Sequence, residues 1–208
     1  MSSRAIQLYK EHFADKGFER IDLFELLVER FGVQRALYPG SFVHVSPSFV
    51  IPSVTYVDTD RRCPRFFEDP PIRRMVKRRK RYQGAPEIVF RAADYSEPLD
   101  EHDASYDLLI SQWAGPVSQV CKRYLRVGGI LVANDSHGDA SLASLDDNYA
   151  LVAVITRRSG THRLTNKDLH TYFAPKSGKP ATREAIKRTG RGIAYTKSAT
   201  AYVFERIG

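Results

Sequence analysis

Short apolar runs that stop on polar residues recur along this chain. Residues 54–57 and 88–93 are two such runs, and each leads into an acid, Asp58 or Asp94. Two more runs, at residues 106–110 and 130–133, are separated by a stretch of helical character that ends in a glycine pair. Apolar runs of this length, alternating with helices, are typical of buried strands in a parallel sheet. The pattern predicts an α/β fold with polar residues at the strand ends, where such sheets bind small molecules.

The residues before the first predicted strand have a helical pattern. Three apolar side chains form a stripe at helical spacing: Ile6, Tyr9 and Phe13. Asp22 is predicted to cap a helix over residues 23–31, which Gly32 would end. Further along, Ser46 and Pro47 are typical of a helix start, and the N–H groups there are expected to favour a carboxylate or phosphate.

The C-terminal quarter is predicted to add strands to the sheet. A β-branched run at residues 149–156 is followed by a turn at 158–160, and a second strand-like run covers residues 199–206. Between them, a polar loop at residues 175–183 leads to a short helix that ends near residues 190–192. Length and composition leave open whether this loop holds a substrate or is a mobile surface loop.

The order of these elements over residues 33–156 resembles that of class I S-adenosylmethionine-dependent methyltransferases. The resemblance implies a Rossmann-like methyltransferase sandwich, with a mostly parallel seven-stranded sheet and an antiparallel C-terminal strand. The length and composition of the chain favour one domain over residues 1–208, which the resemblance divides into a helical N-terminal extension (1–32), a cofactor-binding core (33–156) and a basic region that completes the sheet (157–208). At 208 residues, 42% of them hydrophobic, the chain is long enough for one substantial core.

The resemblance assigns cofactor-binding roles to the predicted strand ends. In that family the first strand ends in a glycine-rich turn and the second in an acid that binds the ribose hydroxyls. Here the first turn is degenerate, with Gly40 alone, and Asp58 follows 18 residues later, near the ~20 expected. Asp94 would lie beside the adenine, and Gly128 and Gly129 match the family's turn into strand five. The residues expected to bind S-adenosylmethionine are Tyr38, Pro39, Gly40, Ser41, Asp58, Thr59, Ala93, Asp94, Tyr95, Ser111, Gln112 and Trp113.

A polar loop at residues 134–139 follows the fifth predicted strand, where substrate chemistry is expected. His137 is the candidate general base, and Asp135 would orient it or a substrate donor, with Asn134 beside them. The alternative is a turn that caps the next helix, over residues 140–145. For His44, in the first loop, a hydrogen bond to the backbone is the more usual explanation.

The net charge of +8 is concentrated in two segments. Residues 61–82 hold ten Lys or Arg and two acids, and residues 157–208 hold twelve and three. Within the first segment, Ile72, Met75 and Val76 are spaced for a helix that packs by a narrow stripe. The cations on its other faces are either a solvated surface or a contact surface for the phosphates of a nucleic acid.

Several classes of site are not indicated by the sequence. No apolar run reaches ~18 residues, and the N-terminus lacks the apolar core of a secretory signal, so a cytoplasmic location is expected. Cys63 and Cys121 are isolated, and no metal site is predicted. The function predicted is a transferase: a methyltransferase whose acceptor is RNA or another anionic molecule. The alternative is a non-catalytic methyltransferase-like module that binds nucleic acid or protein; a dinucleotide-dependent oxidoreductase is disfavoured because the first turn lacks G-x-G-x-x-G.

Overall fold

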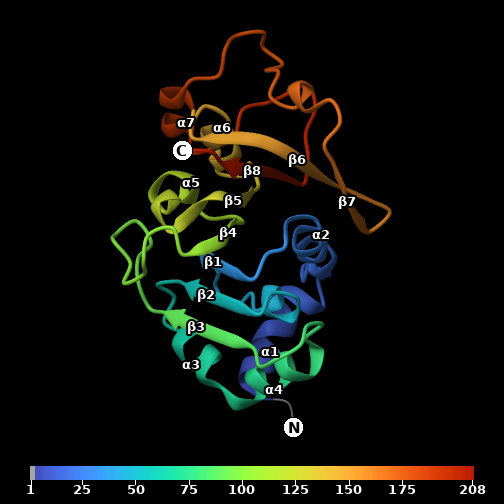
Figure 1. Cartoon of the computed structure of the whole chain (residues 1–208), viewed down its shortest axis with the longest axis vertical. Helices are drawn as coiled ribbons and strands as arrows, with labels where there is room; N and C mark the ends of the chain where they lie inside the picture. The colour runs from blue at the N-terminus through green and yellow to red at the C-terminus, as the bar shows by residue number, and fades with distance from the viewer. Residues whose placement is uncertain (1–2) are drawn as a thin grey trace. The chain divides into compact units, whose positions relative to one another are not determined.

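The computed structural model describes residues 3–208, and the chain divides into two compact units, residues 1–94 and 95–208 (Figure 1). Each unit contributes its own strands and its own helices. Every helix in the part of the chain that the structure describes is too short or too polar to cross a membrane. The prediction of one domain over residues 1–208 stays a prediction.

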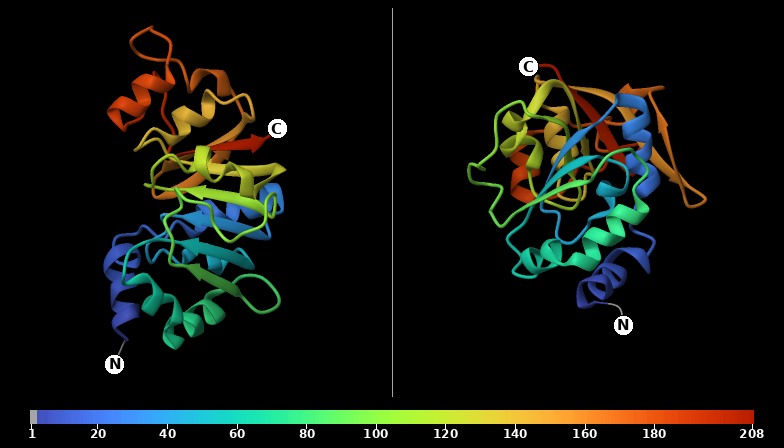
Figure 2. Two further views of the ribbon diagram at one scale, coloured as in Figure 1. Left: turned by 90° about the vertical axis from the view of Figure 1, so that its left-hand side faces the viewer. Right: turned by 60° about the horizontal axis from the view of Figure 1, so that its bottom comes forward.

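The first unit contains a parallel sheet of three strands in the order β3-β2-β1. The strands are β1 (Arg35–Pro39), β2 (Ser53–Val57) and β3 (Glu87–Arg91), with Ala36 opposite Val54 and Val54 opposite Ile88. The helices are α1 (Arg4–Tyr9), which continues as the π-helix η1 (Lys10–Ala14), α2 (Ile21–Phe31), the 3-10 helix η2 (Ser46–Phe49), α3 (Cys63–Glu68) and α4 (Pro70–Arg79). Helices α1 and α4 lie side by side (Figure 2).

Helix α2 begins earlier than predicted. Its N-cap is Arg20, in the left-handed region at φ 54°, so Asp22 lies inside the first turn and the prediction that it caps the helix was wrong. The Asp22 carboxylate accepts the N–H of the next residue, Leu23, at 3.1 Å. Gly32 ends the helix as predicted, with φ 66° and its N–H donated to the Val28 carbonyl.

The segment after β1 forms a short buried 3-10 helix, η2, in place of an anion-binding helix start. All four of its residues are buried, and the Ser48 N–H donates to the Tyr56 hydroxyl at 3.2 Å. Since this N–H group points into the core, the expectation of a carboxylate or phosphate site at this helix start was wrong.

Strand β3 is shorter than the apolar run that predicted it. Its partner β2 ends at Val57, opposite Arg91, and the last ladder bond runs from the Asp58 N–H to the Arg91 carbonyl. With no neighbouring strand to pair with beyond this point, the chain turns, and Asp94 lies three residues past the strand rather than at its end.

The second unit contains five strands in the order β4-β5-β8-β6-β7. Strands β4 (Tyr106–Ser111) and β5 (Leu125–Ala133) are parallel, and the C-terminal strand β8 (Ala201–Arg206) lies antiparallel between β5 and β6 (Tyr149–Arg158), as predicted. Residues 3–208 thus form eight strands, one more than the seven expected, because the chain after the predicted turn returns as a hairpin strand, β7 (Thr161–Thr165).

The glycine pair predicted as a turn lies inside β5. The register slips between Tyr106, opposite Leu125, and Leu108, opposite Ile130, so two steps along β4 match five along β5. Such a bulge accommodates Gly128 and Gly129 within the strand, and the expected turn was wrong.

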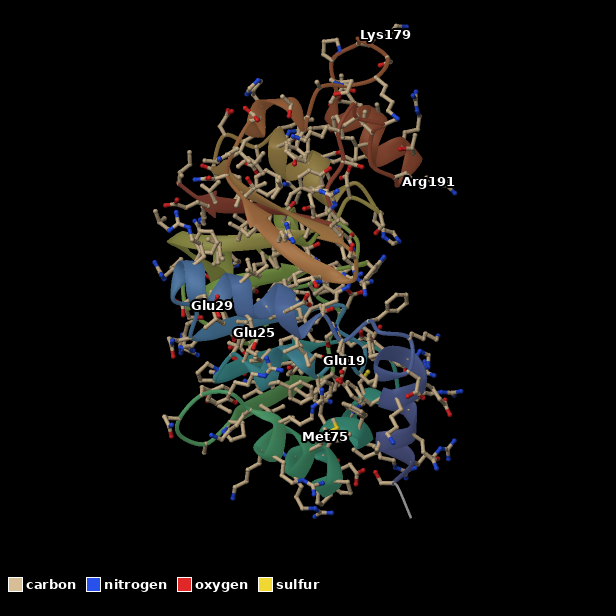
Figure 3. All side chains as sticks on the ribbon, turned by 90° about the vertical axis from the view of Figure 1, so that its right-hand side faces the viewer. Glu19, Glu25, Glu29, Met75, Lys179 and Arg191 are labelled. Atoms are coloured by element: carbon tan, nitrogen blue, oxygen red, sulfur yellow. The ribbon has the colours of Figure 1, made fainter. Side chains whose placement is uncertain are left out.

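The second unit also contains several short helices. They are α5 (Val117–Val120), the 3-10 helix η3 (Lys122–Tyr124), α6 (Asp139–Ser144), the 3-10 helix η4 (Leu169–Thr171) and α7 (Arg183–Thr189). Helix α7 packs against α6 and ends at Gly190, as predicted. Lys179 lies at the tip of the polar loop that leads to α7 (Figure 3).

Glu19 joins three elements of the first unit. Its two carboxylate oxygens accept from the Arg79 guanidinium of α4 at 2.7 and 3.0 Å, and the Tyr9 hydroxyl of α1 donates to the same carboxylate. Burial raises the pKa of Glu19, but the hydrogen bonds from Arg79 and Tyr9 and the charge of Arg79 together lower it by more, so the net pKa lies below its ordinary value. The carboxylate is therefore charged and shared between the segment before α2, α1 and α4.

Glu19→Ala should reduce the free energy of unfolding by about 2–3 kcal/mol, because Arg79 and Tyr9 both lose a charged partner in a partly buried site. Glu25→Ala is the matched control, since Glu25 pairs with Arg81, which is more exposed than Arg79, and this variant should cost less than about 1 kcal/mol. Urea unfolding of the two variants measures both values. Equal losses would show that Glu19 does not hold these elements together.

Candidate functional site

The carboxyl ends of β1, β2 and β3 meet at one edge of the first unit's sheet, because the three strands are parallel. Most of the cofactor residues predicted in this unit lie at or just past this edge. They are Tyr38, Pro39, Gly40, Ser41, Asp58 and Thr59, with Ala93 and Asp94 in the turn after β3. The edge of a parallel sheet at its carboxyl ends is where α/β folds bind nucleotides.

Gly40 begins the turn after β1. Its φ is +64°, a conformation that glycine adopts without strain. The N–H groups of Gly40 and Ser41 both donate to the Val57 carbonyl, at 2.8 and 3.3 Å. The turn therefore closes directly onto the end of β2.

Asp58 holds the loop that follows this turn. Its Oδ2 accepts the Phe42 N–H at 2.7 Å, and its Oδ1 accepts the Asp60 N–H at 2.8 Å. Phe42 has φ 46°, an uncommon conformation for a residue other than glycine, and the bond to Asp58 helps to fix it. A carboxylate has about four acceptor positions, so the half-buried Asp58 keeps two for further donors such as hydroxyl groups.

The Tyr38 side chain belongs to the core of the unit. The His44 Nε2 donates to the Glu19 carbonyl at 3.1 Å, so its Nδ1 accepts the Tyr38 hydroxyl at 3.0 Å. Burial lowers the pKa of His44 to about 3, and the ring stacks on Phe13 with centroids 4.4 Å apart. The expectation that His44 is bonded to the backbone is confirmed, and the Tyr38 phenol is already committed to it.

Three residues near Asp58 were not among the predicted site residues: Phe42, Asp60 and Arg62. The Arg62 guanidinium lies 4.5 Å from the centre of the Phe42 ring. It also donates two hydrogen bonds to the Asp60 carboxylate, at 2.8 and 2.9 Å. The Asp60 side chain also accepts the Arg62 N–H, and the pKa of Asp60 falls to about 2, chiefly because of the hydrogen bonds from Arg62. Aspartates at positions 58 and 60 are typical of a turn, so the sequence could have indicated Asp60 and Arg62. No sequence pattern indicated Phe42.

The ends of β4 and β5 come together in the second unit. Ser111 pairs with Ala133, and the Asn134 N–H donates to the Ser111 carbonyl at 3.1 Å. The Asn134 side chain then accepts the Trp113 N–H at 3.4 Å. Trp113 has φ 56° and is 47% exposed, so an apolar ring is presented at the strand end on a strained backbone.

Asp135 does not orient His137. Its carboxylate accepts the N–H and hydroxyl of Ser141 in α6 at 2.7 and 2.8 Å, and its carbonyl accepts the Gly192 N–H at 3.2 Å. Burial raises the pKa of Asp135 above its usual range. His137 is exposed, and its Nδ1 lies 3.0 Å from the Ser136 hydroxyl. Asp135 therefore caps the start of α6, as the alternative prediction had it. The prediction that Asp135 orients His137 was wrong.

The most buried carboxylate of this unit, Asp139, was not among the predicted site residues. It accepts the Ser111 hydroxyl at 2.5 Å and the Ser118 N–H at 3.0 Å, and the Ser118 hydroxyl also donates to it. Burial raises the pKa of Asp139 to about 6, against these hydrogen bonds, which lower it. The Ser111 hydroxyl, which was predicted to face the cofactor, therefore donates its hydrogen bond to Asp139 instead.

Neither cysteine is a reactive candidate. Cys63 and Cys121 are free and buried, and burial raises the pKa of each thiol to about 12. Within residues 3–208, no cluster of three or more His, Cys, Asp or Glu side chains is arranged to hold a metal ion.

Comparison with known proteins gives a fold but no sequence family. No family model matches the chain, and no curated protein matches it. Among solved structures, a proposed O-methyltransferase from Klebsiella pneumoniae is 13% identical, covers 79% of this chain and 88% of its own, and has a TM-score of 0.51. The O-methyltransferase TomG from Streptomyces achromogenes, in complex with S-adenosylmethionine, is 12% identical over the same shares, with a TM-score of 0.48. The chain has the Rossmann-like methyltransferase fold, and the predicted fold class is confirmed.

The stability contributed by Asp139 should fall as the pH rises. Its folded pKa of about 6 lies above the ~3.9 of an unfolded aspartate, so the contribution is present at low pH and is lost as the pH rises through the folded pKa. Urea unfolding should therefore show that the free energy of unfolding of Asp139→Asn, relative to that of the wild type, rises by about 2 kcal/mol between pH 4.5 and pH 7.5.

Asp146→Asn is the control for this measurement. Burial raises the pKa of Asp146, but the hydrogen bonds from Lys122 and the Asn148 N–H, together with the charges of Lys122 and Arg183, lower it by more in total, so the net shift is downward. Its contribution is complete above the unfolded pKa, and the loss in this variant should be equal at the two pH values. If Asp139→Asn also shows no change with pH, the carboxyl is not protonated near neutrality in the folded state.

Proposed function

We propose that this chain is an S-adenosylmethionine-dependent methyltransferase. The observation that carries the proposal is Asp58: an acid at the end of the second strand of a methyltransferase fold, half-buried, with two acceptor positions left for the ribose hydroxyls. The fold likeness to the Klebsiella pneumoniae protein supports this role, as does the Gly40 turn beside it.

The other predicted contacts are proposed on the same likeness. The backbone of residues 38–41, together with Thr59, would bind near the ribose and methionine parts, and residues 93–95 near the adenine. In the second unit, Ser111, Gln112 and Trp113 are also proposed as cofactor-binding residues, with Ser111 acting through its backbone because its hydroxyl is bonded to Asp139. The exposed imidazole of His137 and the Asn134 amide are proposed to face the acceptor.

The chemistry would be an in-line displacement in which the cofactor supplies a methyl group on a cationic sulfur. The residues of this chain would bind and orient the two reactants and exclude water, since a displacement of this kind depends mainly on alignment. His137 is the candidate to accept the proton that the acceptor loses. The acceptor is proposed to be RNA or another anionic molecule, because of the basic segments at residues 61–82 and 157–208.

A second candidate is a non-catalytic binding module for nucleic acid or protein. The closed first turn favours it: the N–H groups of Gly40 and Ser41 already donate to Val57, and a four-residue buried 3-10 helix follows. These N–H groups are therefore engaged before any ligand binds.

Calorimetric titration with S-adenosylmethionine should give micromolar binding that Asp58→Ala weakens at least about tenfold, the equivalent of one charge-assisted hydrogen bond. Glu68→Ala is the control, because it removes one exposed acid from α3 in the same unit. Its affinity should equal that of the wild type.

Circular dichroism and melting curves would establish that the variants are folded. Absence of binding to folded wild-type protein would exclude the enzyme and leave the binding module. Equal weakening in Asp58→Ala and Glu68→Ala would remove Asp58 from the site.

A further inference from the structure

A groove of about 710 Å³ lies between α1 and α3 of the first unit, beside the segment that leads into α3. Four arginines line it, Arg4 from α1 and Arg61, Arg62 and Arg65 from around α3. We call it the arginine groove. A volume in this range suits a ligand the size of a nucleotide.

Three of the four arginines of the groove have no acidic partner within the described residues, whereas Arg62 is paired with Asp60. Among residues 3–208, Arg4, Arg61 and Arg65 form no ion pair within 4 Å, and all three side chains are exposed. Arg62 forms a bidentate ion pair with Asp60. Three guanidinium groups without an ionic partner around one concavity repel one another and produce a positive potential that an anion would relieve.

Two acids also line the groove, and they have different roles. Asp69 accepts the Ser3 hydroxyl at 2.7 Å, which joins the start of α1 to the start of α4. Glu11 is exposed and has no ion pair within the described part of the chain. Glu11 would therefore repel an anion, and its removal should strengthen binding.

The geometry points to the arginine groove as a binding site for the phosphate of a nucleotide, either free or within a single strand. Guanidinium forks match phosphate oxygens in bidentate pairs, and a phosphate carries enough charge for more than one of them. Leu8 and Ala5 add partly exposed apolar surface for the rest of the nucleotide. The site goes beyond methyl transfer, because it uses neither Asp58 nor the residues at the ends of β4 and β5.

The test compares two double variants that remove the same charge from the same basic segment. Arg61→Gln with Arg65→Gln alters the groove, while Arg73→Gln with Arg74→Gln alters exposed positions of α4 that do not line it. Binding of a fluorescent ten-nucleotide single strand is measured by anisotropy, and binding of adenosine monophosphate by calorimetry, both at low salt. The groove variant should bind both probes at least about tenfold more weakly, and the α4 variant less than about threefold more weakly. Glu11→Gln should bind both probes more tightly than the wild type.

The two probes distinguish the two sources of the phosphate. Binding of both assigns a site that takes a nucleotide in either form, and binding of the strand alone assigns a nucleic acid. Adenosine without a phosphate must not compete, which separates this site from an adenosine site for the cofactor. Equal losses in the two double variants, competition by adenosine, or no binding of either probe to the folded wild type would each overturn the inference. Since Asp58 is unchanged in both variants, the result is independent of the cofactor titration.

Discussion

The hydrogen bond from the Phe42 N–H to the Asp58 carboxylate is the constraint on which the first unit's site depends. It holds a non-glycine residue at φ 46°, and with it the loop between the Gly40 turn and the buried η2 helix. The same carboxylate fixes the Asp60 N–H, and Asp60 in turn holds Arg62 over the Phe42 ring. One half-buried acid therefore shapes the turn, the loop and one wall of the arginine groove, and still has lone pairs for a ligand.

The second unit has a comparable centre in Asp139, with a different balance. Its carboxylate is almost fully buried, so the charged form is costly and its pKa rises to about 6 in spite of the donors from Ser111 and Ser118. These bonds join the end of β4 to the starts of α5 and α6. Asp135 adds a second link, between the end of β5, Ser141 and the Gly192 segment. The polar residues after β5 thus serve mainly to fix the chain, and His137 alone among the ionisable ones is exposed.

The chain shows that a methyltransferase fold can be present without a recognisable sequence family. The layout of strands is preserved at 13% identity, because buried apolar runs and their order determine the sheet, and many sequences satisfy that requirement. Function depends on particular side chains at the strand ends. In this chain Asp58 follows β2, and the turn after β1 begins at Gly40 and is closed by hydrogen bonds to Val57. The arginine groove is lined by residues of α1, η1 and α3 and the segments beside them, away from the strand ends, and is proposed as a separate phosphate site.

The sequence by itself determined the order of strands and helices, the antiparallel C-terminal strand, and Asp58 as the acid after the second strand. The order of the elements and the position of Asp58 follow from local periodicity, whereas the antiparallel direction of the last strand was implied by the resemblance to methyltransferases. The tertiary structure alone decided where β3 stops, since Arg91 is the last residue with a partner on β2, and which residues Asp135 and Asp139 hold. It also gathered Arg4 with Arg61 and Arg65, residues almost 60 positions apart in the chain. Hydrogen-bond partners and charge clusters depend on contacts between distant segments, and no local pattern in the sequence encodes them.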